Sequence, residues 1–229
     1  MDVATFFNEL YRTHDRFWWR DKDRYATNPD AYPYSLIMQL TLRLLADRPP
    51  GRALDLGAGE GADSIRLALL GYQVDALDIS EVAAEKIRKF AADAGVQVRV
   101  QLGDVADFIP QRPYDIVICN GLLQYVRDKE PVIRRMQDAT QPGGLNVVSL
   151  WSTYTPVPDE HSCVPVFCDD EDGEVAKLYQ DWEKELYYFE REKPEKSHSG
   201  MPPHSHSHIK LIARKPVACQ AAAVRRVNR

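Results

Sequence analysis

The chain has 229 residues, 44% of them hydrophobic, which is enough apolar side chain for one domain of ordinary size. No stretch reaches the ~18 uninterrupted apolar residues that a membrane-spanning helix needs, and MDVATFFNEL lacks the basic start and apolar run of a secretion signal. Four cysteines without a C-x-x-C pair argue against a disulfide scaffold or a structural zinc site. We therefore expect a reduced, cytoplasmic protein without a membrane segment and without a metal.

The net charge of −5 is unevenly distributed. Residues 169–196 carry eleven acidic and five basic side chains, whereas residues 210–229 carry six basic side chains and no acidic one. A nucleic-acid-binding protein gathers basic residues on the face that it uses, but here they gather in the last residues, where AAAVRRVNR is typical of a frayed terminus. We expect no nucleic-acid partner and a disordered tail over 217–229.

The first half of the chain alternates strand-like and helix-like segments. Residues 1–34 are expected to form an aromatic lid, and residues 35–216 one domain that begins with an amphipathic helix over 35–46. Residues 53–59 form an apolar strand that runs into a glycine turn, and the helix after it ends at Gly71. A second strand over 72–78 precedes a helix that Ser80 caps and Gly95 ends.

The second half continues the alternation. Residues 96–104 alternate like a half-exposed edge strand, whereas residues 114–120 are continuously apolar and predict a central strand. A helix over 128–139, a QPGG turn over 141–144 and a strand over 145–151 follow. After a long loop we expect a helix over 174–185 and strands over 186–192 and 208–215, joined as a hairpin through a histidine-rich arm.

This order predicts an α/β fold: a Rossmann-like three-layer sandwich with a seven-stranded, mostly parallel sheet and an antiparallel last strand. The carboxyl ends of parallel strands in such a sheet are where ligands bind. The glycine turn Asp55-Leu56-Gly57-Ala58-Gly59-Glu60-Gly61 lies at the first of these ends, where glycines let the backbone approach a ligand.

The glycine turn alone fits two kinds of cofactor. Gly57, Gly59 and Ala62 satisfy the pattern G-x-G-x-x-[GA], and Asp78 lies near the ribose position of a nicotinamide-binding fold. Asp55 and Glu60, however, flank the turn, and at an effective dielectric near 20 each would cost a pyrophosphate about 3–4 kcal/mol before screening. A cationic cofactor would be attracted instead.

The motif order DLGAGEG, Asp78, Gly103-Asp104-Val105 and QPGG resembles class I S-adenosylmethionine (SAM)-dependent methyltransferases. The resemblance implies that the glycine turn holds the methionine part of SAM, that Asp78 binds the ribose hydroxyls and that Asp104 contacts adenine. The cofactor-binding residues that it implies are Asp55, Gly57, Ala58, Gly59, Asp78, Ile79, Gly103, Asp104, Val105 and Asn120. Asp104 has an alternative reading as a helix cap.

Shorter matches in the flanks, WWRDKDRY, EVAKLYQDWE and IKLIARK, resemble TehB-type (tellurite-resistance) methyltransferases. This resemblance implies the fold and the cofactor but not tellurite as the substrate. The alternatives left open are a nicotinamide-dependent oxidoreductase, for which the chain shows no Tyr-x-x-x-Lys pair, and a non-catalytic SAM-binding module.

The methyl acceptor is expected to be a small molecule held near the loop after the fifth strand, over 151–168, and the arm over 198–208. Candidate substrate and lid residues are Tyr11, Trp18, Trp19, Arg20, Tyr25, Trp151 and Tyr154. A soft oxyanion or thiol needs no general base, whereas a hydroxyl, carboxyl or amine acceptor would use His206, His204 or His161. The alternative for the histidines is a solvated arm, or a metal site if they share one face. The oligomeric state is not predicted.

Overall fold

The structure is a computed structural model that describes residues 1–17, 36–157, 164–169, 173–195 and 203–217. The predictions for Trp18, Trp19, Arg20, Tyr25, His161 and the tail after Val217 lie outside these residues.

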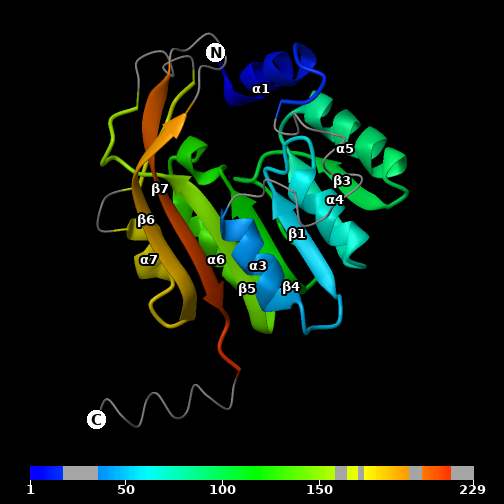
Figure 1. Cartoon of the computed structure of the whole chain (residues 1–229), viewed down its shortest axis with the longest axis vertical. Coiled ribbons are helices and arrows are strands. Elements are labelled where there is room, and N and C mark those ends of the chain that lie inside the picture. The colour runs from blue at the N-terminus through cyan, green and yellow to red at the C-terminus, as the bar shows by residue number, and fades with distance from the viewer. Residues whose placement is uncertain (18–35, 158–163, 170–172, 196–202, 218–229) are drawn as a thin grey trace.

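One seven-stranded sheet runs through the molecule in the order β3-β2-β1-β4-β5-β7-β6 (Figure 1). The strands are β1 (Arg52–Leu56), β2 (Gln73–Asp78), β3 (Val98–Leu102), β4 (Tyr114–Asn120), β5 (Thr140–Trp151), β6 (Glu183–Glu195) and β7 (His204–Arg214). The first five pair in parallel, and β7 is antiparallel to both β5 and β6. The predicted mostly parallel sheet with an antiparallel last strand is confirmed.

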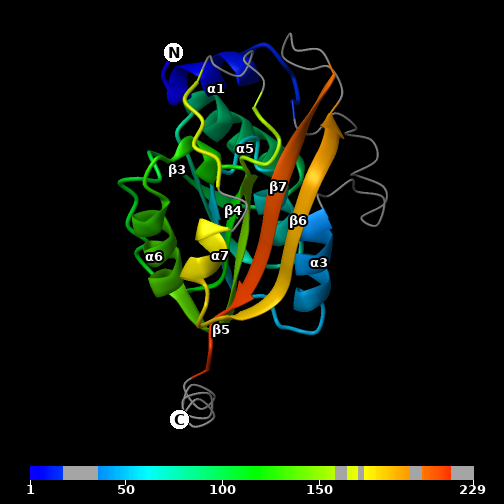
Figure 2. The same ribbon diagram turned by 90° about the vertical axis from the view of Figure 1, so that its left-hand side faces the viewer.

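Helices cover both faces of the sheet and complete the predicted three layers. On one face α3 (Leu36–Leu45), α4 (Ala62–Leu69) and α5 (Glu81–Asp93) pack against the strands. On the other face lie α6 (Lys129–Ala139) and α7 (Glu174–Leu178). Figure 2 shows α3 and the α6–α7 pair on opposite sides of the sheet. The two faces of the sheet are therefore both buried, as its parallel strands require.

Strand burial follows the sequence pattern. Every residue of β4 from Ile116 to Cys119 is buried, and this strand is the fourth of seven, whereas β3 alternates between half-buried and exposed residues at the edge of the sheet. Gly71 and Gly95, just beyond α4 and α5, have φ angles of 90° and 69°, which glycine adopts without strain. The predicted central strand, edge strand and two helix ends are confirmed.

The C-terminal part corrects two predicted boundaries. The helix expected over 174–185 ends at Leu178, because residues from Glu183 onward pair with β7 instead of continuing the helix. The strand expected to begin at His208 begins at His204, because Glu195 and Lys193 of β6 pair with His204 and His206. The histidines therefore lie in the sheet and not on a solvated arm.

The QPGG segment is an interruption within β5 and not a turn before it. Tyr114 pairs with Thr140 and Ile116 already pairs with Leu145, so the four residues between Thr140 and Leu145 bulge out of register. Gly143, with φ of 79°, allows this bulge.

Helix α1 (Val3–Arg12) lies in the segment expected to be a lid. The Asp2 side chain caps it by accepting from Thr5 N at 2.9 Å. It packs on α5, above the carboxyl ends of the strands at the top of Figure 1. Among the described residues, no helix is long and apolar enough to span a bilayer.

A buried polar network closes the β5 bulge against α6 and α7. The Tyr179 hydroxyl, fully buried, donates to Asn146 Oδ1 at 3.0 Å, and Asn146 Nδ2 donates to Thr140 Oγ1 at 2.6 Å. Thr140 Oγ1 in turn donates to the Met136 carbonyl. Each group in this network thus forms a hydrogen bond with the next one.

We expect Tyr179→Phe to lower the free energy of unfolding by about 1–3 kcal/mol, because it leaves Asn146 Oδ1 buried without its donor. Urea titration measures the loss. Tyr188→Phe, which removes a hydroxyl from a side chain that is 41% exposed, is the matched control and should change stability by less than about 0.5 kcal/mol. Equal effects of the two substitutions would contradict the network.

Candidate active site

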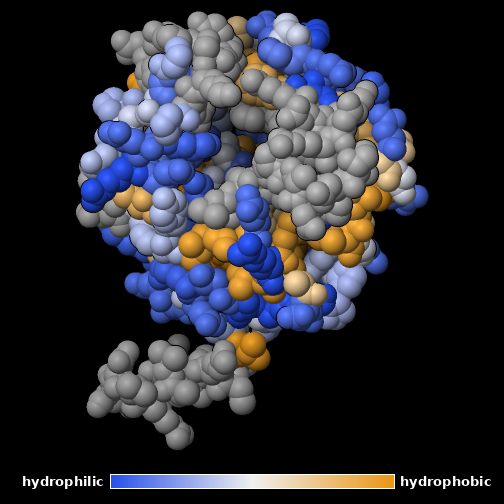
Figure 3. Space-filling model, in the orientation of Figure 1, coloured by the Kyte–Doolittle hydropathy of each residue, from blue (hydrophilic) through white to orange (hydrophobic). Residues whose placement is uncertain are grey.

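The turn after β1 is a cradle that only glycine fits. Gly57, Gly59 and Gly61 have φ angles of 69°, 56° and 82°. Gly57 N and Ala58 N donate to the Leu77 carbonyl at 2.9 and 3.0 Å, which ties the turn to β2. A Cβ on Gly57 would lie 2.9 Å from Leu122 Cβ, in the loop after β4. The loops after β1 and β4 thus approach each other closely at this edge, where Figure 3 shows the molecule hollowed.

Asp78 joins the loops after β1 and β2. Its Oδ2 accepts from Gly59 N at 2.7 Å, and its Oδ1 accepts from Ser80 N at 2.8 Å. The side chain is buried, and Ile79, between Asp78 and Ser80, is half-buried. Asp78 thereby holds both loops in place, and each carboxylate oxygen keeps lone-pair capacity for a further donor.

Two further carboxylates, Asp55 and Asp63, lie close to each other, and Asp55 is also close to Asp78. Asp55, buried at the end of β1, accepts from Ser64 Oγ at 2.6 Å, and Asp63, half-buried at the start of α4, accepts from Asn120 Nδ2 at 3.1 Å. Asn120 Oδ1 accepts from Ser149 Oγ of β5 at 2.8 Å. We call Asp55, Asp63 and Asp78 the carboxylate cluster.

Burial raises the pKa values of all three acids. Burial and then the neighbouring Asp63 charge raise the pKa of Asp55 to about 7, against the hydrogen bond from Ser64. Burial raises the pKa of Asp63 to about 6 and that of Asp78 to about 6, although amide donors partly offset it. The site therefore brings three carboxyl groups together with no cationic side chain hydrogen-bonded to them among the described residues, and a cation would stabilise their charged form.

The sequence prediction brought Asp55, Asp78 and Asn120 to this place but missed Asp63, Ser64 and Ser149. The signal for Asp63 and Ser64 was present, because both follow the glycine turn in the first turn of α4 and so lie at the same sheet edge. Ser149 precedes Trp151 by two residues in β5, so the two side chains point to the same face.

Glu60 corrects the electrostatic prediction. It is buried, but both of its carboxylate oxygens accept from Phe17 N, at 3.1 and 2.9 Å, and Lys86 Nζ lies 2.8 Å from Oε1. Its charge is therefore neutralised by Lys86 and directed at the N-terminal segment, so it does not flank a ligand as expected. For Asp55, that role stays a prediction.

The segment after β3 lies at the rim of the site. Gly103 N donates to the Asp78 carbonyl at 2.9 Å, and Val105 is buried. Asp104 is exposed, and its Oδ1 accepts from Ala106 N at 2.8 Å, the geometry of an Asx turn. The adenine contact implied for Asp104 stays a prediction, and the helix that it was alternatively expected to cap is only a short turn.

Aromatic rings form a continuous wall beside the carboxylate cluster. Phe7 of α1 packs edge-on against Tyr125 with ring centres 5.3 Å apart, and Tyr125 packs edge-on against Trp151 at 6.1 Å. Trp151 stacks on His206 at 4.1 Å, with only 9° between the ring planes. We call Phe7, Tyr125, Trp151 and His206 the aromatic wall.

Two further histidines of β7, His204 and His208, lie beside His206 of this wall. His206 is buried, and its Nε2 lies 3.1 Å from Nε2 of the half-buried His204. The ring of His208 lies 6.2 Å from that of His206. Within the described ranges, no three histidine, cysteine, aspartate or glutamate side chains are placed to share a metal ion.

Tyr11 and Tyr154, two of the described candidate substrate and lid residues, pack against other aromatic side chains. Tyr11 is buried, stacks on Phe7 at 5.8 Å and carries Lys86 over its ring. Tyr154 packs edge-on against Phe189 of β6 at 5.6 Å, with Arg191 over its ring. Their predicted contact with a substrate stays a prediction.

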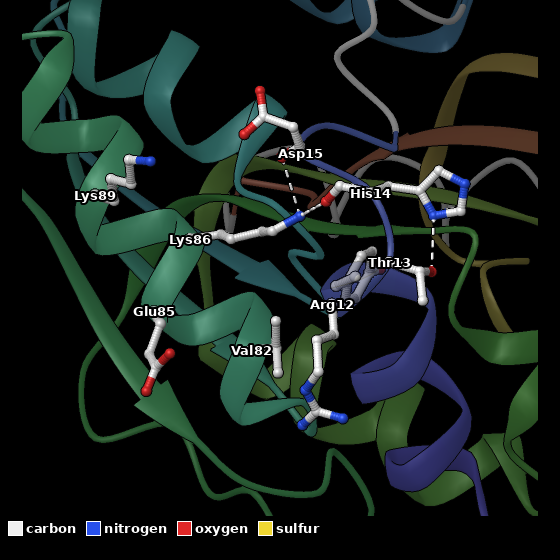
Figure 4. A pocket seen from close by; sticks show the side chains of 9 residues that line it. Arg12, Thr13, His14, Asp15, Val82, Glu85, Lys86 and Lys89 are labelled. Atoms are coloured by element: carbon white, nitrogen blue, oxygen red, sulfur yellow. Dashed lines mark hydrogen bonds between the residues drawn. The ribbon is translucent and has the colours of Figure 1, made fainter.

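A pocket of about 390 Å³ lies outside the carboxylate cluster, between the end of α1 and the flank of α5. Lys86 in its wall points between the backbone carbonyls of His14 and Asp15, as Figure 4 shows. Arg12 and Lys89 line the same open surface.

Comparison with known proteins bears on the whole domain. Residues 48–193 match a family described as "Methyltransferase domain". The chain is 30% identical over 138 residues to the probable S-adenosyl-L-methionine-dependent methyltransferase TehB of Haemophilus influenzae, covering 58% of this chain and 46% of that protein. The crystal structure of TehB from this organism has a TM-score of 0.67 at 23% identity, covering 81% of this chain and 65% of that one, which shows the shared fold.

Two other relatives act on different substrates. A ubiquinone biosynthesis O-methyltransferase of Xanthomonas euvesicatoria is 32% identical over 135 residues, covering 57% of this chain and 54% of that protein. A tRNA 5-carboxymethoxyuridine methyltransferase of Escherichia coli is 29% identical over 137 residues, covering 57% and 52%. This chain therefore spans about half the length of the curated relatives that it matches.

We expect the carboxylate cluster to make the ligand-free protein less stable as the pH rises. Because the folded-state pKa values are raised above the ordinary aspartate value, the unfolded chain loses these protons first, so the free energy of unfolding falls between about pH 4 and pH 7. Asp55→Asn should remove the contribution of Asp55 to this fall. The variant should therefore be more stable than wild type at pH 8, by roughly 1–3 kcal/mol.

Urea titrations at pH 5 and pH 8 measure this difference. The exposed Asp107→Asn is the matched control and should follow the wild-type dependence. A pH dependence of Asp55→Asn identical to that of wild type would contradict the raised pKa of Asp55.

Proposed function

The chain belongs to the methyltransferase-domain family, and on that premise we propose that it transfers a methyl group from SAM to a small-molecule acceptor. The observation that carries the proposal is the carboxylate cluster beside the glycine cradle. SAM bears an ammonium and a sulfonium but no phosphate, so it matches a site where Asp55, Asp63 and Asp78 concentrate negative charge.

The residues present fit this cofactor. Asp55, Asp63 and Asn120 would hold the cationic methionine end, and the cradle at Gly57, which a side chain would fill, leaves room for the backbone to approach it. Asp78 has acceptor capacity for the two ribose hydroxyls. Gly103, Asp104 and Val105 supply the rim on the adenine side.

When bound, SAM supplies an electrophilic methyl group, and the remaining work falls on the chain. Methyl transfer needs a nucleophile held ~3–3.5 Å from the methyl carbon, in line with the bond that breaks, and water kept out. Ser149 contacts Asn120 of the cofactor side, and Trp151, two residues further along the same face of β5, begins the acceptor side. The aromatic wall would therefore lie next to a bound cofactor, which supports its assignment to the acceptor side.

The wall favours an acceptor with a planar, apolar face, which would stack on Trp151 or Tyr125. His206 and His204, with ring nitrogens 3.1 Å apart, can take a proton from a hydroxyl, carboxyl or amine. This pair favours a protonated acceptor over a soft oxyanion or thiol, which needs no base.

Charge placement favours a small molecule over a nucleic acid. The three described basic residues near the C-terminal end of β7 are engaged within the domain: Lys210 with Glu190, Arg214 with Glu185, and Lys215 with the Gln137 and Thr140 carbonyls. They are thus not presented as a phosphate-binding face. The tRNA methyltransferase among the relatives makes tRNA an acceptor to include in the assays.

Calorimetry with SAM, its demethylated product S-adenosylhomocysteine (SAH) and NAD tests the cofactor. Wild type should bind SAM and SAH, and Asp78→Asn should weaken both by roughly 10–100-fold, because it removes the charge and one acceptor facing the ribose. Asp107→Asn should bind like wild type. Binding of NAD without SAM would overturn the proposal in favour of the oxidoreductase alternative, and tight SAM binding with no turnover of any acceptor would favour a binding module.

His206→Phe tests the base. It keeps a ring against Trp151 but removes both nitrogens, so with a hydroxyl or amine acceptor kcat should fall by about 10²–10⁴. In wild type, kcat should fall about tenfold per pH unit on the acid side of its profile, because an imidazole must be neutral to accept a proton, and this acid limb should vanish in the variant. An unchanged profile, with SAH affinity and melting temperature preserved, would rule out His206 as the base.

A further inference from the structure

Residues 1–17 bond to two of the loops that form the cofactor cradle. Glu60 lies inside the glycine turn after β1, yet it accepts from Phe17 N with both oxygens. Asn8 Oδ1 of α1 accepts from Ser80 Oγ at 2.7 Å, in the loop after β2, and from Val82 N at 3.3 Å, in the first turn of α5. The backbone N–H of Ser80 donates to Asp78, so the α1 contact is one residue removed from the ribose-facing carboxylate.

Lys86 strengthens the first of these ties. Its Nζ lies 2.8 Å from Glu60 Oε1 and donates to the carbonyls of His14 and Asp15, at 2.5 and 3.0 Å (Figure 4). One ammonium thus joins the glycine turn, α5 and the chain just after α1. The Lys86 side chain is 15% exposed and that of Glu60 0%, so solvent weakens this pair less than a surface ion pair.

The same segment also reaches the acceptor side. Phe7, one residue before Asn8, packs edge-on against Tyr125 in the loop after β4. Tyr11 and Phe17 are buried against Ala83 of α5. Residues 1–17 therefore bond or pack with the loops after β1, β2 and β4, which carry the cradle, Asp78 and the aromatic wall.

We propose that Glu60 is a positioning residue that, through Phe17 and Lys86, couples the docking of residues 1–17 to cofactor binding. The proposal rests on the proposed function. Glu60 does not itself face the carboxylate cluster, but it fixes the turn whose Gly59 N bonds Asp78. Because docked α1 and bound cofactor favour the same loop geometry, each should increase the affinity of the other by the same factor.

The test compares Glu60→Ala, Glu60→Gln and Asn8→Ala with wild type. Glu60→Ala removes both bonds to Phe17 N and the partner of Lys86, and should raise the Kd for SAH tenfold or more. Glu60→Gln keeps an acceptor for Phe17 N and should restore the Kd to within about threefold of wild type. The matched control is Arg12→Ala on the exposed face of α1, which should leave the Kd unchanged.

Two further readouts separate positioning from simple destabilisation. In wild type, saturating SAH should slow hydrogen exchange of the α1 amides about tenfold, and in Glu60→Ala this protection should be lost. The KM for SAM should rise more than kcat falls, because the cofactor still reacts once bound. If Glu60→Ala does not fold, Asn8→Ala carries the test, with an expected threefold to tenfold rise in the Kd.

The outcomes are distinguishable. If wild type binds neither SAM nor SAH, the proposed function fails and the coupling fails with it. If wild type binds SAH but the folded Glu60 and Asn8 variants bind within twofold of it, or SAH leaves α1 exchange unchanged, only the positioning role is overturned.

Discussion

The structure depends on the burial of three carboxylates at one end of a parallel sheet. Charged groups away from water are costly, and burial accordingly raises the pKa values of Asp55, Asp63 and Asp78. Amide and hydroxyl donors from the glycine turn, Ser64, Ser80 and Asn120 offset part of it. A cation would offset the remainder, so the cost of burying these carboxylates becomes a source of affinity for the proposed cofactor.

Strand β5 connects the proposed cofactor side of the site to the proposed acceptor side. Ser149 and Trp151 lie on one face of β5, the first bonded through Asn120 to the carboxylate cluster and the second stacked on His206. Because β7 is antiparallel to β5, its first residues, which include the histidines, lie at the edge of the sheet where the parallel strands end. The carboxylate cluster and the aromatic wall are thus connected through two side chains that lie two residues apart on β5.

The sequence predicted what is encoded locally or by regular alternation. Strand apolarity, Gly71 and Gly95 located β1 to β5 and the helices between them, and the glycine turn with Asp78 located the cofactor end. Which distant segments pair with each other could not be predicted from the sequence pattern. The extension of β7 to His204 and the early end of α7 follow from strand partners that periodicity does not reveal.

The site showed the same division. Asp55 and Asp78 lie at the carboxyl ends of β1 and β2, so their positions follow from the topology, whereas the partner of Glu60 is a lysine 26 residues later on α5. The misjudged role of Glu60 came from counting charges along the chain without their partners in space. α1 went unpredicted because its aromatic residues were interpreted as a lid, although Asp2 and Thr5 mark a helix start.

The acidic stretch of the sequence includes β6, which pairs with β7 and forms one edge of the sheet. Its residues from Glu183 to Glu195 include five glutamates, and Pro194 near its end has no N–H to offer. A second chain approaching this border to add an eighth strand would meet charged side chains along β6, including Lys184, Arg191 and Lys193 between the glutamates. The border thus discourages sheet-to-sheet aggregation while its inner side remains paired with β7.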